Sequence, residues 1–212
     1  MRIKTLIVDD HTIMRDGLKQ ILANYADIQV AGEACDGEEA LRMIRQQKYD
    51  VLLLDMSMPG RSGIDLLKQI KLENPVLPVL VLSMHKENQY AGRTLSAGAS
   101  GYLCKEGAST QLVCAIRKVA SGGIFISPET AESMALKSIT RKNDALPHTL
   151  LSDREHQIFE LIVAGKSITE IAHTLNISVK TVSTHKTRIK QKLGRKTVAE
   201  LVRYAIEHDL TI

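Results

Sequence analysis

The chain has 212 residues, of which 44% are hydrophobic and 25% are charged, and it carries a formal net charge of +4. This composition is ordinary for a globular protein and excludes disorder as the overall description, and the length suits one domain of about 120 residues and one of about 60. The longest apolar runs are strand-sized, far below the roughly 20 residues that span a bilayer, and the three cysteines have no CxxC spacing. We therefore expect a cytoplasmic protein with reduced thiols and no membrane contact.

The first 120 residues alternate short apolar, β-branched runs with longer segments of helical period. The predicted strands are 3–8, 28–33, 50–54, 78–82 and 101–103, and the predicted helices are 11–24, 37–47, 63–73, 87–97 and 109–121. Two of the strands, VLLLD and VLVLS, are continuously hydrophobic, which is typical of strands buried on both faces of a parallel sheet. The pattern predicts a doubly wound α/β domain whose functional edge lies beyond the carboxyl ends of its strands.

The pattern changes after residue 122. Between 123 and 150 we predict a linker that contains one helix, capped by Ser127 with Pro128 in its first turn. No strand is predicted beyond it, and four helices are expected at 152–164, 167–175, 178–193 and 197–208. The sequence therefore predicts two domains, an α/β domain over 1–122 and an all-α domain over 151–212.

Polar side chains stand at the carboxyl ends of four predicted strands. Asp9 and Asp10 follow the first strand, Asp55 the third, Ser83 the fourth and Lys105 the fifth. Parallel strands bring these ends to one edge, where gathered carboxylates repel one another unless a cation compensates. Carboxylate oxygens suit Mg²⁺, which also engages phosphate. The arrangement predicts phosphoryl transfer to a carboxylate, with Asp55 as the nucleophile.

A simpler interpretation exists for each of these residues taken singly. Aspartate is a common N-cap residue, so Asp9 or Asp10 alone is explained by helix capping. An isolated Lys105 carries no information. Capping does not explain why such side chains end several strands of one predicted sheet, and we therefore favour the phosphoryl-transfer hypothesis.

Four segments together resemble the receiver domain of response regulators over about the first 120 residues. They are LIVDDH, VLLLDMSMPGRSGIDLL, VLVLSMH and GASGYLCKE. The resemblance implies a flavodoxin-like, five-stranded parallel sheet of order 2-1-3-4-5. It also implies that Asp9, Asp10, Asp55 and the backbone carbonyl of Ser57 hold Mg²⁺, and that Asp55 accepts a phosphoryl group from a sensor histidine kinase.

The same resemblance assigns roles to three further residues. Lys105 contacts a phosphoryl oxygen, and Ser83 and Tyr102 form the pair that switches when Asp55 is phosphorylated. Receivers usually have proline after this lysine, often with a cis peptide bond, whereas Glu106 follows Lys105 here. A cis bond without proline costs about 3 kcal/mol, which disfavours the cis geometry here and leaves the role of Lys105 unchanged.

The second and third helices of the second domain predict a helix-turn-helix. Ser167 and Ser178 stand at their N-cap positions, and a short turn joins them. On a helical wheel Val182, Ile189 and Leu193 fall on one side of the third helix, which we predict to be its core face. Its other side is polar and basic, as a helix that enters a DNA major groove requires.

A basic run accompanies this helix, since seven basic and no acidic residues lie between Lys180 and Lys196. Such a run is often just a solvated face, or it binds a membrane surface. Exposed Leu, Phe and Trp, which would insert into a membrane, are scarce here, and aromatic residues that would stack on RNA bases are absent. DNA is the partner that the sequence favours.

The segment 151–194 resembles the four-helix DNA-binding domain of the NarL/FixJ (LuxR-type) regulators. This resemblance implies that Ser183, Thr184 and Thr187 face base edges. It gives as candidates for phosphate contact Lys180, Thr181, His185, Lys186, Arg188 and Lys190. The family often has lysine where this chain has Ser183, so its base preference does not transfer.

The last predicted helix has an apolar stripe that includes Val198, Leu201 and Val202. Closure of the domain core is the simpler role for this stripe. The resemblance adds that the helix forms the dimer contact on DNA, and the two roles are compatible if they use different sides.

These observations predict a response regulator that binds promoter DNA as a homodimer and is not an enzyme, beyond slow loss of its own phosphate. Three alternatives remain. A regulator of the same fold could work without phosphorylation, although the acidic pocket is complete. A Mg²⁺-dependent aspartyl-phosphate hydrolase would show DxDxT where this chain has DDHTI, and a ligand-sensing transcription factor would need an aromatic-lined pocket, whereas residues 1–122 contain no Trp or Phe.

Overall fold

The computed structural model describes residues 2–58, 63–84, 87–105, 108–128, 130–132, 146–208 and 210, without the side chains of 87–89 and 108–110. The chain divides into two compact units, Met1–Leu136 and Lys137–Ile212. No helix in the described part of the chain has both the length and the apolar character needed to cross a membrane.

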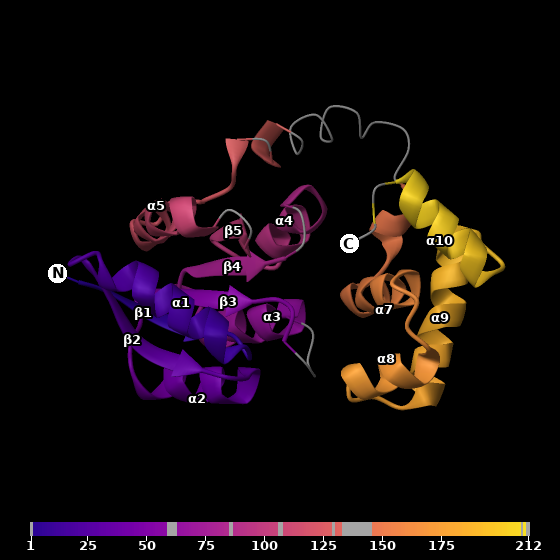
Figure 1. Ribbon diagram of the computed structural model, residues 1–212, viewed down its shortest axis with the longest axis horizontal. Coiled ribbons are helices and arrows are strands. Elements are labelled where there is room, and N and C mark those ends of the chain that lie inside the picture. The colour runs from indigo at the N-terminus through magenta and orange to yellow at the C-terminus, as the bar shows by residue number, and fades with distance from the viewer. Residues whose placement is uncertain are drawn as a thin grey trace. The chain divides into compact units, whose positions relative to one another are not determined.

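The first unit is a parallel five-stranded sheet with helices between its strands (Figure 1). Its strands are β1 (Ile3–Val8), β2 (Ile28–Ala34), β3 (Val51–Asp55), β4 (Val79–Ser83) and β5 (Gly101–Cys104). Its helices are α1 (Thr12–Ala23), α2 (Gly37–Gln46), α3 (Gly63–Glu73), α4 (Glu87–Ser96) and α5 (Ala108–Ala120). The strand order is β2-β1-β3-β4-β5, so the predicted fold and sheet order are confirmed.

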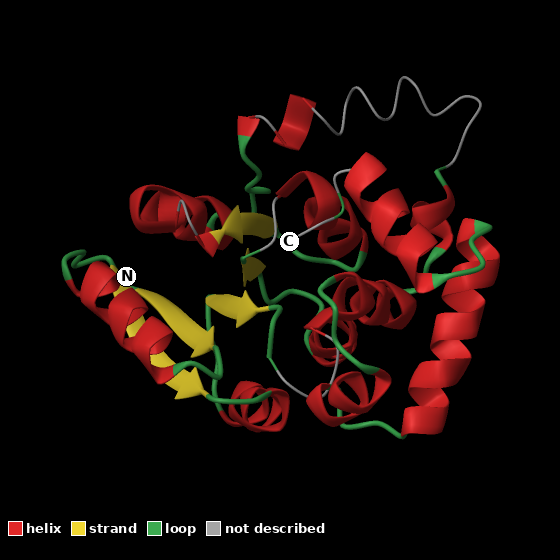
Figure 2. Cartoon of the chain, turned by 45° about the vertical axis from the view of Figure 1, so that its right-hand side comes forward, coloured by secondary structure: helices red, strands yellow, loops and turns green. Residues whose placement is uncertain are grey.

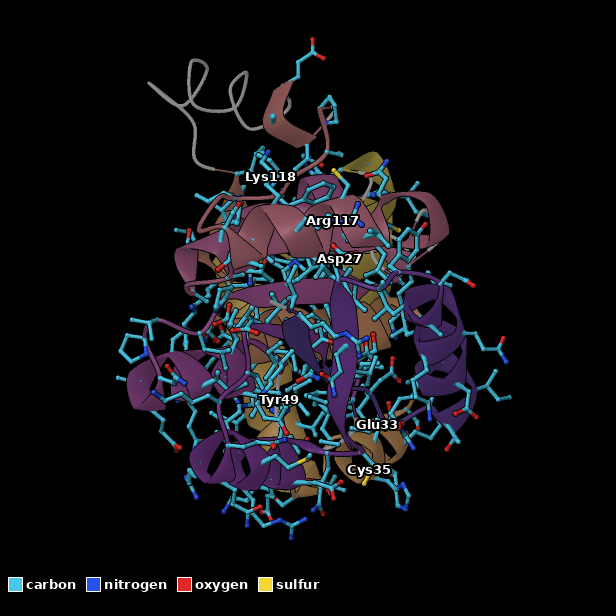
Figure 3. All side chains as sticks on the ribbon, turned by 90° about the vertical axis from the view of Figure 1, so that its left-hand side faces the viewer. Asp27, Glu33, Cys35, Tyr49, Arg117 and Lys118 are labelled. Carbon is cyan, nitrogen blue, oxygen red and sulfur yellow. The ribbon has the colours of Figure 1, made fainter. Side chains whose placement is uncertain are left out.

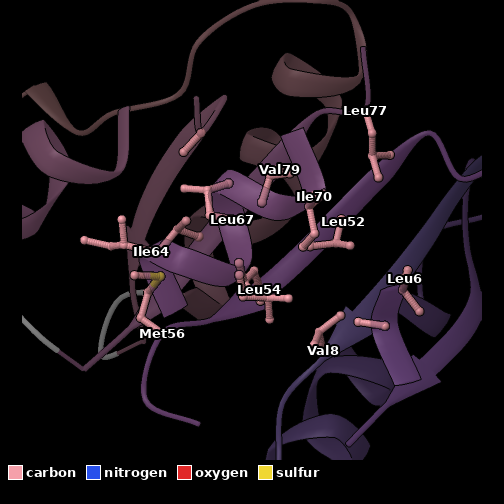
Figure 4. Close-up of a cluster of buried hydrophobic side chains, with 14 of the residues drawn as sticks. Leu6, Val8, Leu52, Leu54, Met56, Ile64, Leu67, Ile70, Leu77 and Val79 are labelled. Atoms are coloured by element: carbon pink, nitrogen blue, oxygen red, sulfur yellow. The ribbon is translucent and has the colours of Figure 1, made fainter. Parts of the chain in front are cut away.

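Helices cover both faces of this sheet because alternate residues of the buried strands point in opposite directions. Leu52 and Leu54 of β3 pack with α2, α3 and α4 in one apolar cluster, part of which Figure 4 shows. Val51 and Leu53 pack with α1 and α5 in a second cluster on the other face. This two-sided burial is the physical reason for the unbroken apolar run of β3.

The strands are all parallel, so their carboxyl ends lie at one edge of the sheet. Figure 2 shows the strands in yellow among the helices in red. Asp55 pairs with Leu82 in the β3–β4 ladder, and Ser83 pairs with Cys104 in the β4–β5 ladder. Strand β3 therefore extends one residue further than predicted and includes Asp55 itself. The position of the nucleophile candidate is set by the sheet and not by a loop.

A surface ion pair joins the beginning of β2 to α5. Arg117 donates to both carboxylate oxygens of Asp27, at 2.8 and 2.9 Å, and its guanidinium lies over the ring of Tyr25. Figure 3 shows Asp27 and Arg117 next to each other. The guanidinium lowers the pKa of Asp27, but both groups are exposed and the pair contributes little to stability.

The segment predicted as a linker, 123–150, makes contacts or forms secondary structure at both of its ends. Phe125 is buried and bridges to Gly101 of β5. Ser127 Oγ accepts from the backbone N–H of Thr130, so the predicted cap is present, and residues 128 and 130–132 are helical. The remaining residues of that predicted helix lie outside the described part of the chain. At the other end a 3-10 helix, η2 (Pro147–Leu150), was not predicted. The boundaries at 122 and 151 stay predictions.

The second unit contains the four predicted helices, each within one residue of its predicted bounds. They are α7 (Asp153–Val163), α8 (Ile168–Thr174), α9 (Val179–Leu193) and α10 (Val198–Glu207). Ser152 and Ser167 begin α7 and α8 with capping boxes, and Ser178 caps α9. Gly194 ends α9 with φ of 64°, a left-handed conformation that glycine adopts without strain.

Candidate functional site

The acidic side chains predicted to converge do converge at the carboxyl edge of the sheet. Asp9 and Asp55 are each 1% exposed, and Asp10 beside them is partly exposed. One potential ligand atom from each of Asp9, Asp10, His11 and Asp55 lies within 4.8 Å of all the others. The cluster has the donor atoms and the spacing of a divalent-cation site.

Lys105 lies between two of these carboxylates. Its Nζ is 2.8 Å from Asp9 Oδ2 and 3.0 Å from Asp55 Oδ1, and only 6% of its side chain is exposed. The lysine reaches the cluster because β5 ends one residue before it. The ammonium neutralises part of the buried negative charge and contacts the Oδ1 oxygen of Asp55 directly.

Burial is the dominant influence on the ionisation of Asp55. It raises the pKa of this carboxyl, Lys105 opposes the rise by charge and hydrogen bond, and the negative charge of Asp9 adds to it. Asp55 Oδ2 and Asp10 Oδ1 are buried and have no hydrogen-bond partner among the described residues. Buried oxygens are seldom left without a partner, and a bound cation would satisfy both.

The other predicted pocket residues lie close to Asp55 in the chain or on neighbouring strands. The backbone N–H of Ser57 donates to Asp55 Oδ1 at 3.2 Å. Ser83 ends β4, Tyr102 lies in β5, and both are fully buried. Residues 59–62 and Glu106 lie outside the described residues, and with them the peptide bond between Lys105 and Glu106.

The sequence interpretation missed two residues at this edge. Arg15 of α1 donates to the backbone carbonyl of Asp9 at 2.7 Å, and its Nε lies 3.4 Å from Glu33 at the end of β2. His11 places its imidazole Nδ1 3.0 Å from Asp10 Oδ1. The string DDH contained the signal for His11, whereas no pattern in the sequence links Arg15 to the pocket.

Helix α9 presents the polar and basic face that was predicted for it. Val182, Ile189 and Leu193 are buried in the core of the unit, as the helical wheel predicted. The predicted DNA contacts are all exposed or half-buried, namely Lys180, Thr181, Ser183, Thr184, His185, Lys186, Thr187, Arg188 and Lys190. The helix thus brings these residues together on one elongated surface.

For three of these residues, hydrogen bonds or burial limit how the side chain can bind DNA. Thr184 and Thr187 donate their hydroxyl protons to carbonyls one turn back, at 3.0 and 3.1 Å, and so present acceptor lone pairs outward. Burial lowers the pKa of His185, and its Nδ1 is buried without a hydrogen-bond partner among the described residues. His185 is therefore a weaker candidate for a charged phosphate contact than the neighbouring lysines.

Lys192, part of the basic run, is bonded inward. Its Nζ lies 2.6 Å from Glu155 Oε2 and donates to the carbonyl of Leu150. Glu155 is 3% exposed and also accepts from the Ser152 backbone at 2.8 Å. Burial would raise the pKa of Glu155, but these bonds outweigh it and lower the pKa. The lysine therefore fastens α9 to α7.

The dimer candidates on α10 divide between the core and the surface. Leu201 is fully buried in the unit's own core, whereas Val198 is 36% exposed and Val202 is half-buried. Ile206, one further turn along, is 63% exposed. The surface available to a second copy is therefore formed by the exposed side chains of the helix and excludes Leu201.

The fold and both sites define the class of protein. Residues 5–117 match the family model described as response regulator receiver domain, and residues 149–205 match bacterial regulatory proteins, luxR family. The chain belongs to the response regulators that join a receiver domain to a LuxR-type helix-turn-helix domain. It is a transcription regulator by family and not a conventional enzyme.

Similar proteins extend over nearly the whole chain. Response regulator UvrY of Escherichia coli K12 is 39% identical over 98% of this chain and 95% of its own length. Response regulator GacA of Pseudomonas aeruginosa is 36% identical over 98% and 97%. Among solved structures, RcsB of Salmonella typhimurium matches with a TM-score of 0.74, 30% identity and coverage of 100% of this chain and 99% of that one. A second RcsB structure, bound to promoter rprA in the presence of the phosphomimetic BeF3-, matches with a TM-score of 0.69 at 28% identity, covering 96% and 98%.

Proposed function

We propose that this protein accepts a phosphoryl group on Asp55 from a sensor histidine kinase, with Mg²⁺ held by Asp9, Asp10, Asp55 and the carbonyl of Ser57. The observation that carries the proposal is the position of Lys105 between Asp9 and Asp55, beside carboxylate oxygens that have no partner among the described residues. Buried oxygens in a purely structural ion pair are seldom left without a partner. The protein would do this work in the cytoplasm.

The chemistry follows from the groups around Asp55. A carboxylate oxygen attacks the phosphorus of a phosphohistidine or of acetyl phosphate, a P–O bond forms, and the bond to the donor breaks with its electron pair leaving on the donor. Lys105 neutralises charge on the transferred group. Mg²⁺, when bound, supplies further positive charge to the phosphoryl oxygens. Water attack on the product would give slow self-dephosphorylation.

The response to phosphorylation starts at Ser83 and Tyr102. Ser83 ends the strand next to Asp55, so its hydroxyl is near the position of a phosphoryl oxygen. Tyr102 is fully buried in the neighbouring strand. A new charge-assisted contact of Ser83 would alter the packing around Tyr102, and with it the surface of α4, β5 and α5.

The output is binding of promoter DNA by a homodimer. RcsB has been solved as dimers on DNA, and the α9 surface of this chain carries hydroxyls for base edges and lysines for phosphates. Each copy alone binds weakly, whereas two linked copies bind as one bivalent ligand. Val198, Val202 and Ile206 of α10 form the contact between copies in this proposal.

Labelling with acetyl phosphate tests the assignment of Asp55. The wild-type chain should become phosphorylated in the presence of Mg²⁺, as a shift on a phosphate-affinity gel, and Asp55→Asn should not. Asp65→Asn is the matched control, because Asp65 is an exposed aspartate in the first turn of α3. Undiminished labelling of Asp55→Asn, or loss of labelling in the control, contradicts the proposal.

A further inference from the structure

Helix capping does not explain the position of the His11 side chain. It is the N-cap residue of α1, yet its imidazole makes no capping hydrogen bond. The backbone N–H of His11 donates to Asp9 Oδ1 at 2.8 Å. The imidazole is 66% exposed and lies with Nδ1 3.3 Å from Asp9 Oδ1 and 3.0 Å from Asp10 Oδ1.

The contact between His11 and Asp10 is close but is not a hydrogen bond. Asp10 Oδ1 has no hydrogen-bond partner in the described part of the chain, although Nδ1 lies 3.0 Å away. Asp55 Oδ2, buried beside it, is likewise without a partner. Three carboxylates and one ring nitrogen thus face a common point with two oxygens left unsatisfied, which is the arrangement that a shared cation would complete.

The spacing agrees with coordination by one ion. The four potential ligand atoms lie within 4.8 Å of one another. A cation with bonds of about 2.2 Å holds opposite ligands about 4.4 Å apart and adjacent ones about 3 Å apart. The His11–Asp10 distance is that of adjacent ligands, and the largest separation needs only a small closing movement.

We propose that His11 is a nitrogen ligand of the cation site and makes the site more selective for first-row transition ions, such as Mn²⁺ and Ni²⁺, than the three carboxylates alone. This inference rests on the cation site of the proposed function. Neutral imidazole binds transition ions well and Mg²⁺ poorly, since Mg²⁺ prefers oxygen ligands. The gain in affinity that His11 provides should be larger for Ni²⁺ than for Mn²⁺, following their general order of affinity for nitrogen ligands.

A second role for His11 predicts a different outcome. If the ring served only as a positive counter-charge for Asp9 and Asp10, it would compete with every cation alike. Its removal would then tighten binding of Mg²⁺ and Ni²⁺ by a similar factor. A ligand role predicts instead that removal weakens Ni²⁺ binding while Mg²⁺ binding changes little.

The experiment measures metal selectivity of the full chain at one fixed pH. Mn²⁺ bound at the pocket is followed by the loss of the free-ion electron paramagnetic resonance signal, and Mg²⁺ and Ni²⁺ are titrated as competitors. The variants are His11→Ala and His11→Gln. Both retain the backbone N–H that donates a hydrogen bond to Asp9. His173→Ala is the control, because His173 is an exposed histidine of α8 and reports nonspecific imidazole binding.

The expected result is that both His11 variants lower the preference for Ni²⁺ over Mg²⁺ about tenfold or more, whereas His173→Ala leaves it unchanged. Nitrogen modulation in the spin-echo spectrum of bound Mn²⁺ should disappear in His11→Ala. An unchanged preference, or equal tightening of all cations, overturns the role of His11 and leaves the proposed function intact. A wild-type chain that binds no divalent cation overturns both.

Discussion

Replacing Lys105 with methionine tests whether its ammonium holds the carboxylate cluster together when no metal is bound. Methionine has nearly the same length and no charge, so Lys105→Met removes contacts of 2.8 and 3.0 Å to Asp9 and Asp55 without leaving a large cavity. The side chain is 6% exposed, and water therefore cannot readily replace it. Two buried carboxylates would lose their shared cation.

The size of the effect follows from the cost of an uncompensated buried charge. Removing one partner of a buried ion pair costs about 3 to 5 kcal/mol. Protonation of Asp55 limits the loss, so we expect the lower end, about 3 kcal/mol. For a domain of this size that corresponds to a fall of roughly 10 °C in the melting temperature of the receiver domain.

The loss of stability in Lys105→Met should depend on the concentration of divalent metal ions. A divalent cation bound to the same carboxylates neutralises them, and in Lys105→Met it no longer competes with the ammonium. Thermal unfolding followed by circular dichroism over a Mg²⁺ series should therefore show the variant approaching the wild type as Mg²⁺ rises. Lys48→Met, at an exposed lysine, is the control. A variant that melts like the wild type without metal, or a deficit that Mg²⁺ does not reduce, refutes the reasoning.

The same variant has a predictable pH dependence. Burial raises the pKa of Asp55 above its unfolded value and Lys105 opposes the rise, so the pKa should rise further in Lys105→Met. The ionised form of such a group destabilises the fold, and this cost appears as pH rises through the folded-state pKa. The deficit should therefore be largest at neutral pH and become smaller in acid, where Asp55 is protonated in both states.

Three further changes test the second domain and the core. Glu155→Gln should destabilise the helical domain by about 1 kcal/mol at neutral pH. Because the pKa of Glu155 is lowered in the fold, the stability difference between variant and wild type, measured by urea unfolding, should vanish as pH falls through that pKa. Lys180→Ala should weaken binding to all DNA sequences and reduce the slope of log K against log salt by about 0.9 in a fluorescence titration; an unchanged slope excludes a phosphate contact. Gly101→Ala should lower stability by about 1 to 3 kcal/mol in thermal unfolding, because an added Cβ would lie 2.8 Å from the Phe125 carbonyl and 2.9 Å from Leu80 Cδ1, and a neutral effect would show that the strand has room to move.

Much of the fold was predictable because local patterns and tertiary structure agree. The unbroken apolar run of β3 indicated burial on both faces, and the two apolar clusters account for it. The serines at 167 and 178 marked two helix starts through capping, which depends only on residues three positions apart. Each of the five strands and nine helices predicted for 1–122 and 151–212 lies within one residue of its predicted bounds in the described part of the chain.

Contacts between residues distant in the chain were not predictable in this way. The charge run suggested that Lys192 belongs to a basic surface, but Glu155, 37 residues away, draws it inward. The apolar stripe of α10 did not reveal that Leu201 is buried while Ile206 is exposed, because periodicity indicates a face and not what covers it.

By itself, the sequence determined which carboxylates gather at the sheet edge, since parallel strands must bring their carboxyl ends together. Only the tertiary structure decided that Lys105 bridges Asp9 and Asp55 and that the His11 ring joins the cluster. The Lys105 contacts depend on distances of a few ångströms between separate strands, which no spacing along the chain encodes. The string DDH places His11 beside the two aspartates in the chain but does not give the direction of its ring.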